Sequence, residues 1–247
     1  MTVKDLIRHY EQRKEEIQAR LAEFPDVYKQ GDLAIFKELC FCILTANTSA
    51  KMGITCIEAA GDDILSADLE SLRRILCGRY RFWKVRPTYI IHTRDYLMKE
   101  TGFGRKALTP LSPHAQAHRI SSSSEPSAPQ CGPQVERNPL RNRIDSLTDF
   151  NERRDFFAAN PGIKGIGYKE ASHFLRNIGF KGYAILDKHI VNLLFEMGVL
   201  PDNKRPTNKK QYVFIEDKMR GFSKKVGIEM DELDLALWSY KTGVILK

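Results

Sequence analysis

Apolar residues recur at helical spacing over most of this 247-residue chain, and alternating strand patterns are nearly absent. Near the N-terminus, Leu6, Tyr10, Ile17, Leu21 and Phe24 form one stripe with charged residues between them. Such periodicity predicts amphipathic helices that pack on one another, and hence an all-α fold. The expected helices are 3–24, 32–46, 49–60, 66–76, 82–99, 147–159, 168–178, 188–197, 208–225 and 231–241.

One segment breaks this pattern. Residues 109–138 hold five of the eleven prolines and six serines, and their few aliphatic residues show no period. Such a composition cannot bury enough apolar area to offset the entropy cost of ordering the chain. We therefore expect a disordered insertion over 104–145. It separates an N-terminal helical part, 1–103, from a C-terminal part, 146–247, and these two parts are expected to pack as one unit.

Composition narrows the classes of protein that the chain can belong to. The net charge is +8, but the insertion supplies six Arg/Lys and three acids, so only +5 remains on the helical parts. That surplus permits a polyanionic partner without establishing one. No apolar run reaches the roughly 18 residues of a membrane span, and the first residues lack a signal-peptide core. The cysteines number five, an odd count, and show no CxxC spacing, which predicts reduced thiols in an intracellular, cytoplasmic protein.

The most informative motif joins two predicted helices through a glycine-rich hairpin. Residues 155–179 read DFFAANPGIKGIGYKEASHFLRNIG. Gly165 and Gly167 allow positive φ and a close backbone approach, and we expect their N–H groups to face outward at a helix N-terminus, where an anion such as phosphate can bind. Ile163 and Ile166 would anchor the hairpin in the core. An ordinary helix–turn–helix connection without a ligand is the alternative.

The segment that follows the hairpin contains two side chains that could take part in catalysis. Lys169 lies two residues into the second helix, and Asp187 follows in AILDKHIVNLLFEMG. Taken singly, a helical lysine is usually solvated, and an aspartate before an apolar helix is usually an N-cap. His173 lies one turn after Lys169, where it would either pack or tune the lysine, and residues 47–49 suit a helix start that also contacts DNA.

Together these segments resemble the type-2 8-oxoguanine DNA glycosylase/AP lyase family, within the helix-hairpin-helix DNA glycosylase superfamily. The resemblance rests on RFWKVRPTYI, KGIGYKEASHFLRNIGF, AILDKHI and DELDLALWSYKTGVILK, and covers residues 1–103 and 146–247. It implies two helical lobes with a cleft between them. The insertion departs from the family pattern but leaves the motif residues intact.

The resemblance assigns catalysis to Lys169 and Asp187. The lysine amine would attack C1′ of the damaged nucleotide, expel the base and form a Schiff base, after which elimination of the 3′ phosphate nicks the strand. The amine must be neutral when it attacks. Asp187 would stabilise positive charge on the sugar or help to move protons.

The resemblance also implies how DNA is held. Trp238 and Phe82 are candidates to stack on a base that has left the DNA duplex. The carboxylate of Lys247 would form hydrogen bonds with the guanine edge. Core packing is the alternative for both aromatic residues. The expected phosphate-binding residues are Lys164, Gly165, Gly167, Arg79, Arg81 and Lys84, with Arg86 in the same basic cluster.

The expected partner is double-stranded DNA containing 8-oxoguanine, bound by a monomer that is associated with the nucleoid. No cofactor or metal is expected, although superfamily analogy suggests an alkali ion at the hairpin carbonyls. No cysteine follows Cys131, which argues against the glycosylases for oxidised pyrimidines that carry an iron–sulfur cluster. A glycosylase for another base and a non-catalytic DNA-binding module are the alternative functions.

Overall fold

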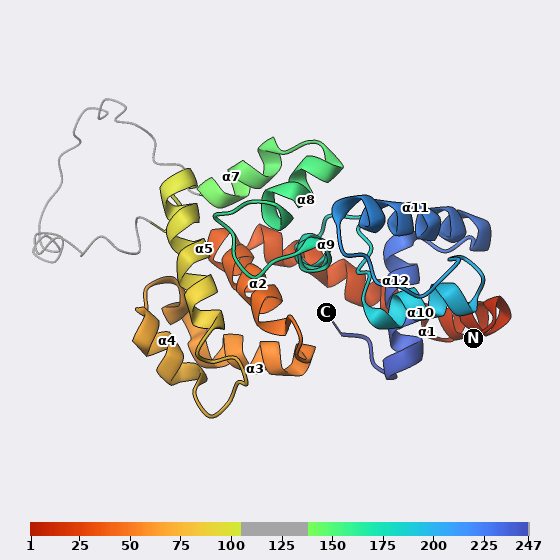
Figure 1. Ribbon diagram of the computed structural model, residues 1–247, viewed down its shortest axis with the longest axis horizontal. Coiled ribbons are helices and arrows are strands. Elements are labelled where there is room, and N and C mark those ends of the chain that lie inside the picture. The colour runs from red at the N-terminus through yellow and green to blue at the C-terminus, as the bar shows by residue number, and fades with distance from the viewer. Residues whose placement is uncertain (105–137, 247) are drawn as a thin grey trace, which may run out of the picture.

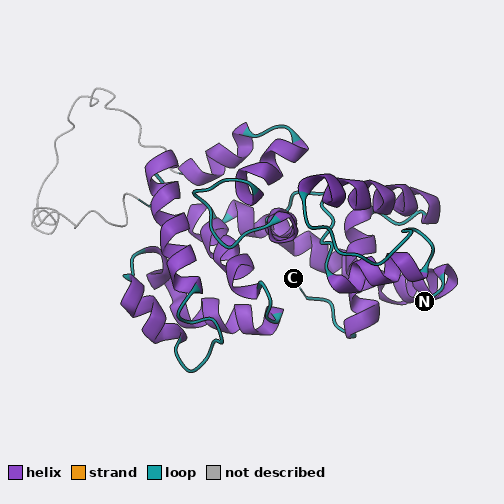
Figure 2. Cartoon of the chain, in the orientation of Figure 1, coloured by secondary structure: helices purple, strands orange, loops and turns teal. Residues whose placement is uncertain are grey.

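The computed structural model describes residues 1–104 and 138–246, and within these ranges it is built from helices and loops without a strand (Figures 1 and 2). The helices before the gap are α1 (Val3–Lys29), α2 (Asp32–Thr45), α3 (Ala50–Ala60), the 3-10 helix η1 (Gly61–Leu65), α4 (Leu69–Leu76) and α5 (Arg86–Thr101). Those after it are α7 (Pro139–Ser146), α8 (Phe150–Ala158), α9 (Tyr168–Asn177), α10 (Lys188–Glu196), α11 (Lys209–Val226) and α12 (Met230–Thr242). The all-α prediction is confirmed.

Side-chain caps fix where many of these helices begin. Thr2, Ser49, Asp68, Asp149, Asp187 and Asn208 each accept a hydrogen bond from a backbone N–H of the helix that follows. Such caps satisfy N–H groups that have no partner within the helix. Asp68 is the N-cap of α4, and Pro87 lies in the first turn of α5, where a missing N–H costs nothing.

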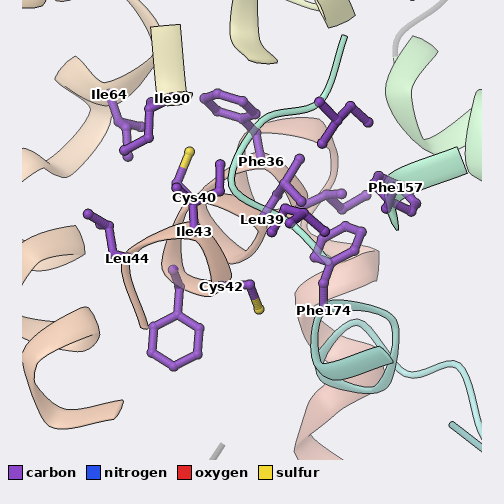
Figure 3. Packing of buried hydrophobic residues seen from close by; sticks show 14 of the residues in the cluster. Phe36, Leu39, Cys40, Cys42, Ile43, Leu44, Ile64, Ile90, Phe157 and Phe174 are labelled. Atoms are coloured by element: carbon purple, nitrogen blue, oxygen red, sulfur yellow. The ribbon is translucent and has the colours of Figure 1, made fainter. Parts of the chain in front are cut away.

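The helices form two lobes, each with its own hydrophobic core. The first core gathers α2 to α9, and α2 is buried along nearly its whole length, with Phe36, Leu39 and Ile43 fully inaccessible (Figure 3). The second core gathers α1, α10, α11 and α12, and α1 packs along α12. Residues from both sides of the gap therefore contribute to each lobe.

Helix α9 lies between the lobes and is bonded to both of them (Figure 1). Asn177 donates a hydrogen bond to Glu38 of α2 at 2.7 Å, and the neighbouring Arg176 donates to Asp234 of α12 at 2.6 Å. All four side chains are buried. The helix that follows the hairpin is thus held by polar contacts on two sides.

The expected insertion is too long at its C-terminal end. Residues 105–137 lie outside the described residues, but 138–145 contain most of α7, and their assignment to a disordered segment is wrong. Pro139 starts this helix, and Leu140 and Ile144 place one buried face against the first core. The Asp32 carboxylate accepts hydrogen bonds from the Leu140 and Arg141 N–H groups.

Helix α5 also begins later than expected, because residues 81–85 form turns. None of the helices in the described ranges combines the length and the apolar character needed to cross a membrane.

Candidate active site

The glycine hairpin is seated on α5 by two close approaches. At Gly162, an added Cβ would lie 2.2 Å from the Tyr96 ring, and at Gly165, where φ is +77°, it would lie 2.7 Å from the Tyr89 ring. Ile163 is buried in the first core, as expected. These contacts require glycine, and they fix the hairpin so that α9 starts at a defined place.

The N-terminus of α9 places Lys169 beside the hairpin. Gly167 is the N-cap, with φ −105°, and its N–H donates to Glu170 Oε2 at 3.3 Å. The other oxygen of Glu170 lies 3.0 Å from Lys169 Nζ. Lys164 N–H donates to Thr93 Oγ1 at 2.9 Å. The described hairpin N–H groups are thus partly engaged by protein oxygens.

A cavity of about 680 Å³ opens between the two lobes. Its wall draws on the α2–α3 connection, on α9, on residues 185–189 and on α12 and the tail that follows it. The side chains that can carry or steer chemistry there are Asn47, Lys51, Lys169, His173, Arg176, Asp187, His189, Arg205, Asp234 and Trp238. The cavity therefore brings Lys169 and Asp187 into one space, although 18 residues separate them in sequence.

Asp187 is presented by an extended segment that side chains hold in place. Within residues 182–186, backbone N–H groups donate to side chains of α11 and α12: Gly182 to Asp231, Ala184 to Glu216, Ile185 to Asp234 and Leu186 to the Tyr212 hydroxyl. This replaces the pairing that a neighbouring strand would provide. Asp187 then caps α10, with Oδ1 accepting from His189 and Ile190 N–H at 2.7 and 2.9 Å.

The second oxygen of Asp187 accepts no hydrogen bond from any residue of the described ranges, and the residue is half-buried in the cavity wall. One oxygen of the carboxylate therefore serves the helix, while the other can face a bound group.

Asp234 forms part of the same cavity wall, and its burial disfavours the ionised form of its carboxyl group. Burial raises the pKa of this carboxyl to about 7, while Arg176 and the Ile185 N–H act in the opposite direction. The charge of nearby Asp187 raises it further. Burial likewise raises the pKa of Asp231. The Arg176 guanidinium is the buried cation that balances this acidic group.

On the side of the first lobe, the α2–α3 connection lines the cavity and has an uncommon backbone conformation. Asn47 has φ +63°, the one positive φ at a non-glycine residue in the described chain. Around it, Tyr80 and Thr48 donate to the Leu44 carbonyl, and Arg86 donates to the Ala46 carbonyl. Ser49 caps α3, as the capping interpretation predicted.

Of the residues expected to act in catalysis or base recognition, three meet in the cavity: Lys169, Asp187 and Trp238. His173 and residues 47–49 also line it. Phe82 does not line it. Its ring is half-buried against the first core, with the Arg81 and Arg86 guanidinium groups 4.9 and 5.7 Å from the ring centre. Lys247 lies outside the described residues, but Leu246 lines the cavity.

The expected phosphate-binding residues divide into two groups. Lys164 is exposed on the hairpin, while Arg79, Arg81 and Lys84 are exposed on the turns between α4 and α5. Arg79 also donates to the Ile75 carbonyl, and Lys84 lies 5.2 Å from the centre of the Trp83 ring. Arg86 is half-buried, and its hydrogen bond to Ala46 gives it a structural role.

Sequence reasoning missed Asp234 and Arg205 in the cavity wall, and Glu170, which contacts Lys169 from outside that wall. An acid among the apolar residues of LDLALW is a signal that could have identified Asp234 as a buried, paired group. Arg205 lies in an irregular loop, where no periodic pattern marks it. Glu170 stands three residues after Gly167, a spacing typical of a capping box.

Comparison with known proteins agrees with this geometry. A family model described as 8-oxoguanine DNA glycosylase matches residues 17–121 and 131–228. The 8-oxoguanine DNA glycosylase/AP lyase of Korarchaeum cryptofilum is 34% identical over 235 residues, which is 95% of this chain and 91% of that protein. The protein of that name from Thermoplasma volcanium is 34% identical over 232 residues, covering 94% of this chain and 91% of its own.

Solved structures give the same result. The Methanocaldococcus jannaschii 8-oxoguanine glycosylase/lyase, crystallised with a 15mer DNA containing 8-oxoguanine, matches with a TM-score of 0.75 and 31% identity over 98% of this chain and 99% of that one. The 8-oxoguanine DNA glycosylase of Thermotoga maritima matches with a TM-score of 0.76 and 29% identity over 99% and 97%. The chain therefore belongs to the 8-oxoguanine DNA glycosylase family.

Proposed function

We propose that this protein is a bifunctional DNA glycosylase and AP lyase that removes 8-oxoguanine from double-stranded DNA, with Lys169 as nucleophile and Asp187 as the catalytic carboxylate. The observation that carries the assignment of residues is the cavity between the lobes, which Lys169 and Asp187 line from different elements. A base inside a duplex is out of reach of such a cavity, so the damaged nucleotide must leave the stack.

The chemistry follows from the two side chains. The neutral Lys169 amine forms a bond to C1′ while the glycosidic bond breaks and the base leaves with its bonding electrons, taking up a proton. The sugar ring opens to a protonated Schiff base. Loss of a C2′ proton then expels the 3′ phosphate, which cuts the strand. Asp187, whose second oxygen faces no donor among the described residues, stabilises positive charge on the sugar during the first step.

Recognition of the base is assigned to the C-terminal lobe. Trp238 lines the cavity from α12 and offers an aromatic face, and Leu246 brings the tail to the same wall. This supports a role for the C-terminal segment, including Lys247, in reading the base. Phe82 packs away from the cavity wall, which favours the structural interpretation of that ring.

Duplex DNA is held at the hairpin and by the basic turns. Lys164, Arg79, Arg81 and Lys84 are exposed and can contact phosphates. We further propose that the protein acts as a monomer, since one chain supplies the whole cavity wall described above. Cys40, Cys42 and Cys56 are buried and belong to no disulfide, in keeping with a reducing compartment inside the cell.

An excision assay on matched duplexes tests this proposal. We expect the protein to release 8-oxoguanine and cut the strand, and to leave a duplex with unmodified guanine intact. Lys169→Gln should bind the damaged duplex with an affinity like that of the wild type, yet show no excision or cutting. Strand cutting by Lys169→Gln at the wild-type rate would overturn the assignment.

A further inference from the structure

One carboxylate at the start of α9 engages both the hairpin backbone and the proposed nucleophile. Glu170 Oε2 accepts the Gly167 N–H at 3.3 Å, and Oε1 lies 3.0 Å from Lys169 Nζ. The side chains are 17% and 32% exposed, so water screens this ion pair only in part. In the described ranges, no other carboxylate oxygen comes within 4.0 Å of this amine.

The Gly167 N–H can bind either the Glu170 carboxylate or a DNA phosphate. The N-terminus of a helix attracts phosphate because its N–H groups and dipole favour negative charge, and Glu170 already occupies the Gly167 donor. A phosphate that binds at this donor must displace the carboxylate, since the two anions repel one another at such short range. Displacement would also break the contact between Glu170 and Lys169.

The structure leaves space for that movement. Glu170 lines a second cavity of about 370 Å³, together with Arg205, Thr207 and Asn208. Lys169 and Arg205 belong to the walls of both cavities. The carboxylate can therefore rotate away from Gly167 toward a cation without entering the space proposed for the base.

We infer that Glu170 is a positioning residue that DNA displaces: it holds Lys169 in an ion pair in the free protein, and a backbone phosphate takes its place at the Gly167 N–H in the complex. Binding of the substrate thereby releases the nucleophile. This inference rests on the proposed function, because it requires DNA at the hairpin and Lys169 as the attacking group.

The variant Glu170→Gln removes the negative charge of the side chain but keeps its capping contact with the Gly167 N–H. The glutamine side-chain oxygen can still accept the Gly167 N–H, so the helix start is kept, but it neither pairs with Lys169 nor repels a phosphate. The matched control is Asp202→Asn. Asp202 is an exposed carboxylate in the same loop as Arg205, and it accepts the Lys204 N–H at 2.9 Å, which asparagine can also do.

Two measurements decide the matter. The first is the dissociation constant for a duplex containing a tetrahydrofuran abasic-site analogue, which cannot be cleaved. The second is the single-turnover rate on an 8-oxoguanine duplex at saturating protein. Because a part-exposed ion pair is weak, we expect Glu170→Gln to bind roughly two- to fivefold more tightly than the wild type at low salt. Its saturating rate should stay within about twofold of the wild-type rate, since the carboxylate has already left in the complex.

Three results would overturn the inference. Unchanged or weaker binding by Glu170→Gln would leave the residue with a capping role only. A tenfold or larger loss of the saturating rate would place Glu170 in the chemistry. An equal gain in affinity with Asp202→Asn would reduce the effect to overall charge. If the wild-type protein failed to cut the 8-oxoguanine duplex, the proposed function would fail instead, and the two failures are thus distinguishable.

Discussion

At the scale of single residues, Asp187 has a structural role in the fold and a chemical role in the proposed mechanism. Its Oδ1 caps α10 through two N–H groups, while the residue as a whole lines the cavity beside Lys169. Asparagine caps helices as well as aspartate does, so a substitution can remove the charge and keep the cap.

We therefore expect Asp187→Asn to leave the free energy of unfolding nearly unchanged and to slow base excision on the order of 100-fold, the lower range for a lost catalytic proton or charge partner. Asp187→Ala should add a loss of about 1 kcal/mol in stability from the missing cap. Urea unfolding and single-turnover excision measure the two effects. Wild-type excision by Asp187→Asn would restrict Asp187 to capping.

At the scale of elements, the hairpin depends on glycines that let it lie against α5. The Cβ of an alanine at position 162 would lie 2.2 Å from the Tyr96 ring, so either the ring or the hairpin must move. We expect Gly162→Ala to cost about 1–3 kcal/mol in unfolding free energy, the range for overpacking. Because the hairpin sets the start of α9, excision should fall with it.

Gly221→Ala is the matched control. Gly221 lies within α11, where an added Cβ would meet nothing within 4 Å, so the alanine should stabilise the protein by about 0.5–1 kcal/mol. Thermal unfolding compares both variants with the wild type. Equal melting temperatures for the two would contradict the packing argument.

The contact between α1 and α12 contains a histidine that should make stability depend on pH. His9 Nε2 lies 2.9 Å from Ser239 Oγ, and burial, followed by the nearby charge of Arg13, lowers the His9 pKa below 6.5. A depressed histidine pKa means that the unfolded chain binds more protons than the folded one below pH 6.5. Stability from this site is then fully present above pH 6.5 and is lost as the pH falls through the folded-state pKa.

Urea unfolding between pH 5 and 7.5 checks this prediction. We expect the wild type to lose stability toward the acidic end and His9→Gln to lose less over the same interval. Parallel curves for the two proteins would show that His9 does not contribute.

The sequence was most informative where a local pattern decides the structure. Helical periodicity predicted the described α-helices other than α7, and the family resemblance pointed to Lys169 and Asp187, which the fold brings to one cavity. The sequence was least informative where contacts with residues distant in the chain determine the local structure. The Asp32 carboxylate orders the start of α7, and the side chains that accept hydrogen bonds from residues 182–186 belong to α11 and α12. The sequence left Phe82 open between core packing and base stacking, because a core aromatic and a stacking aromatic look alike in sequence, and its ring packs against the first core.

At the scale of the whole molecule, the cavity exists because two lobes are held at a fixed distance around α9. Arg176 and Asn177 reach from this helix to Asp234 and Glu38, which belong to opposite lobes. Asp234 in turn accepts the Ile185 N–H just before Asp187. The buried polar contacts thus link the arrangement of the lobes to the position of the carboxylate that we propose to be catalytic.

We expect Arg176→Gln to destabilise the protein by about 3–5 kcal/mol, because removing the cation leaves Asp234 buried without its ionic partner. Lys29→Gln is the control, since it breaks an exposed ion pair with Asp26 and should change stability little. Chemical denaturation compares them. A loss for Arg176→Gln no larger than that for Lys29→Gln would show that the link between the lobes carries little of the stability.

The central claim is that Lys169 forms the covalent bond to the sugar, and trapping that bond tests it most directly. The protein is incubated with an 8-oxoguanine duplex in the presence of borohydride, which reduces the Schiff base to a stable amine, and the adduct is digested and located by mass spectrometry. We predict that the modified residue is Lys169 and that Lys169→Gln yields no adduct. A sugar attached to any other residue, or an adduct of undiminished yield in Lys169→Gln, would contradict the claim.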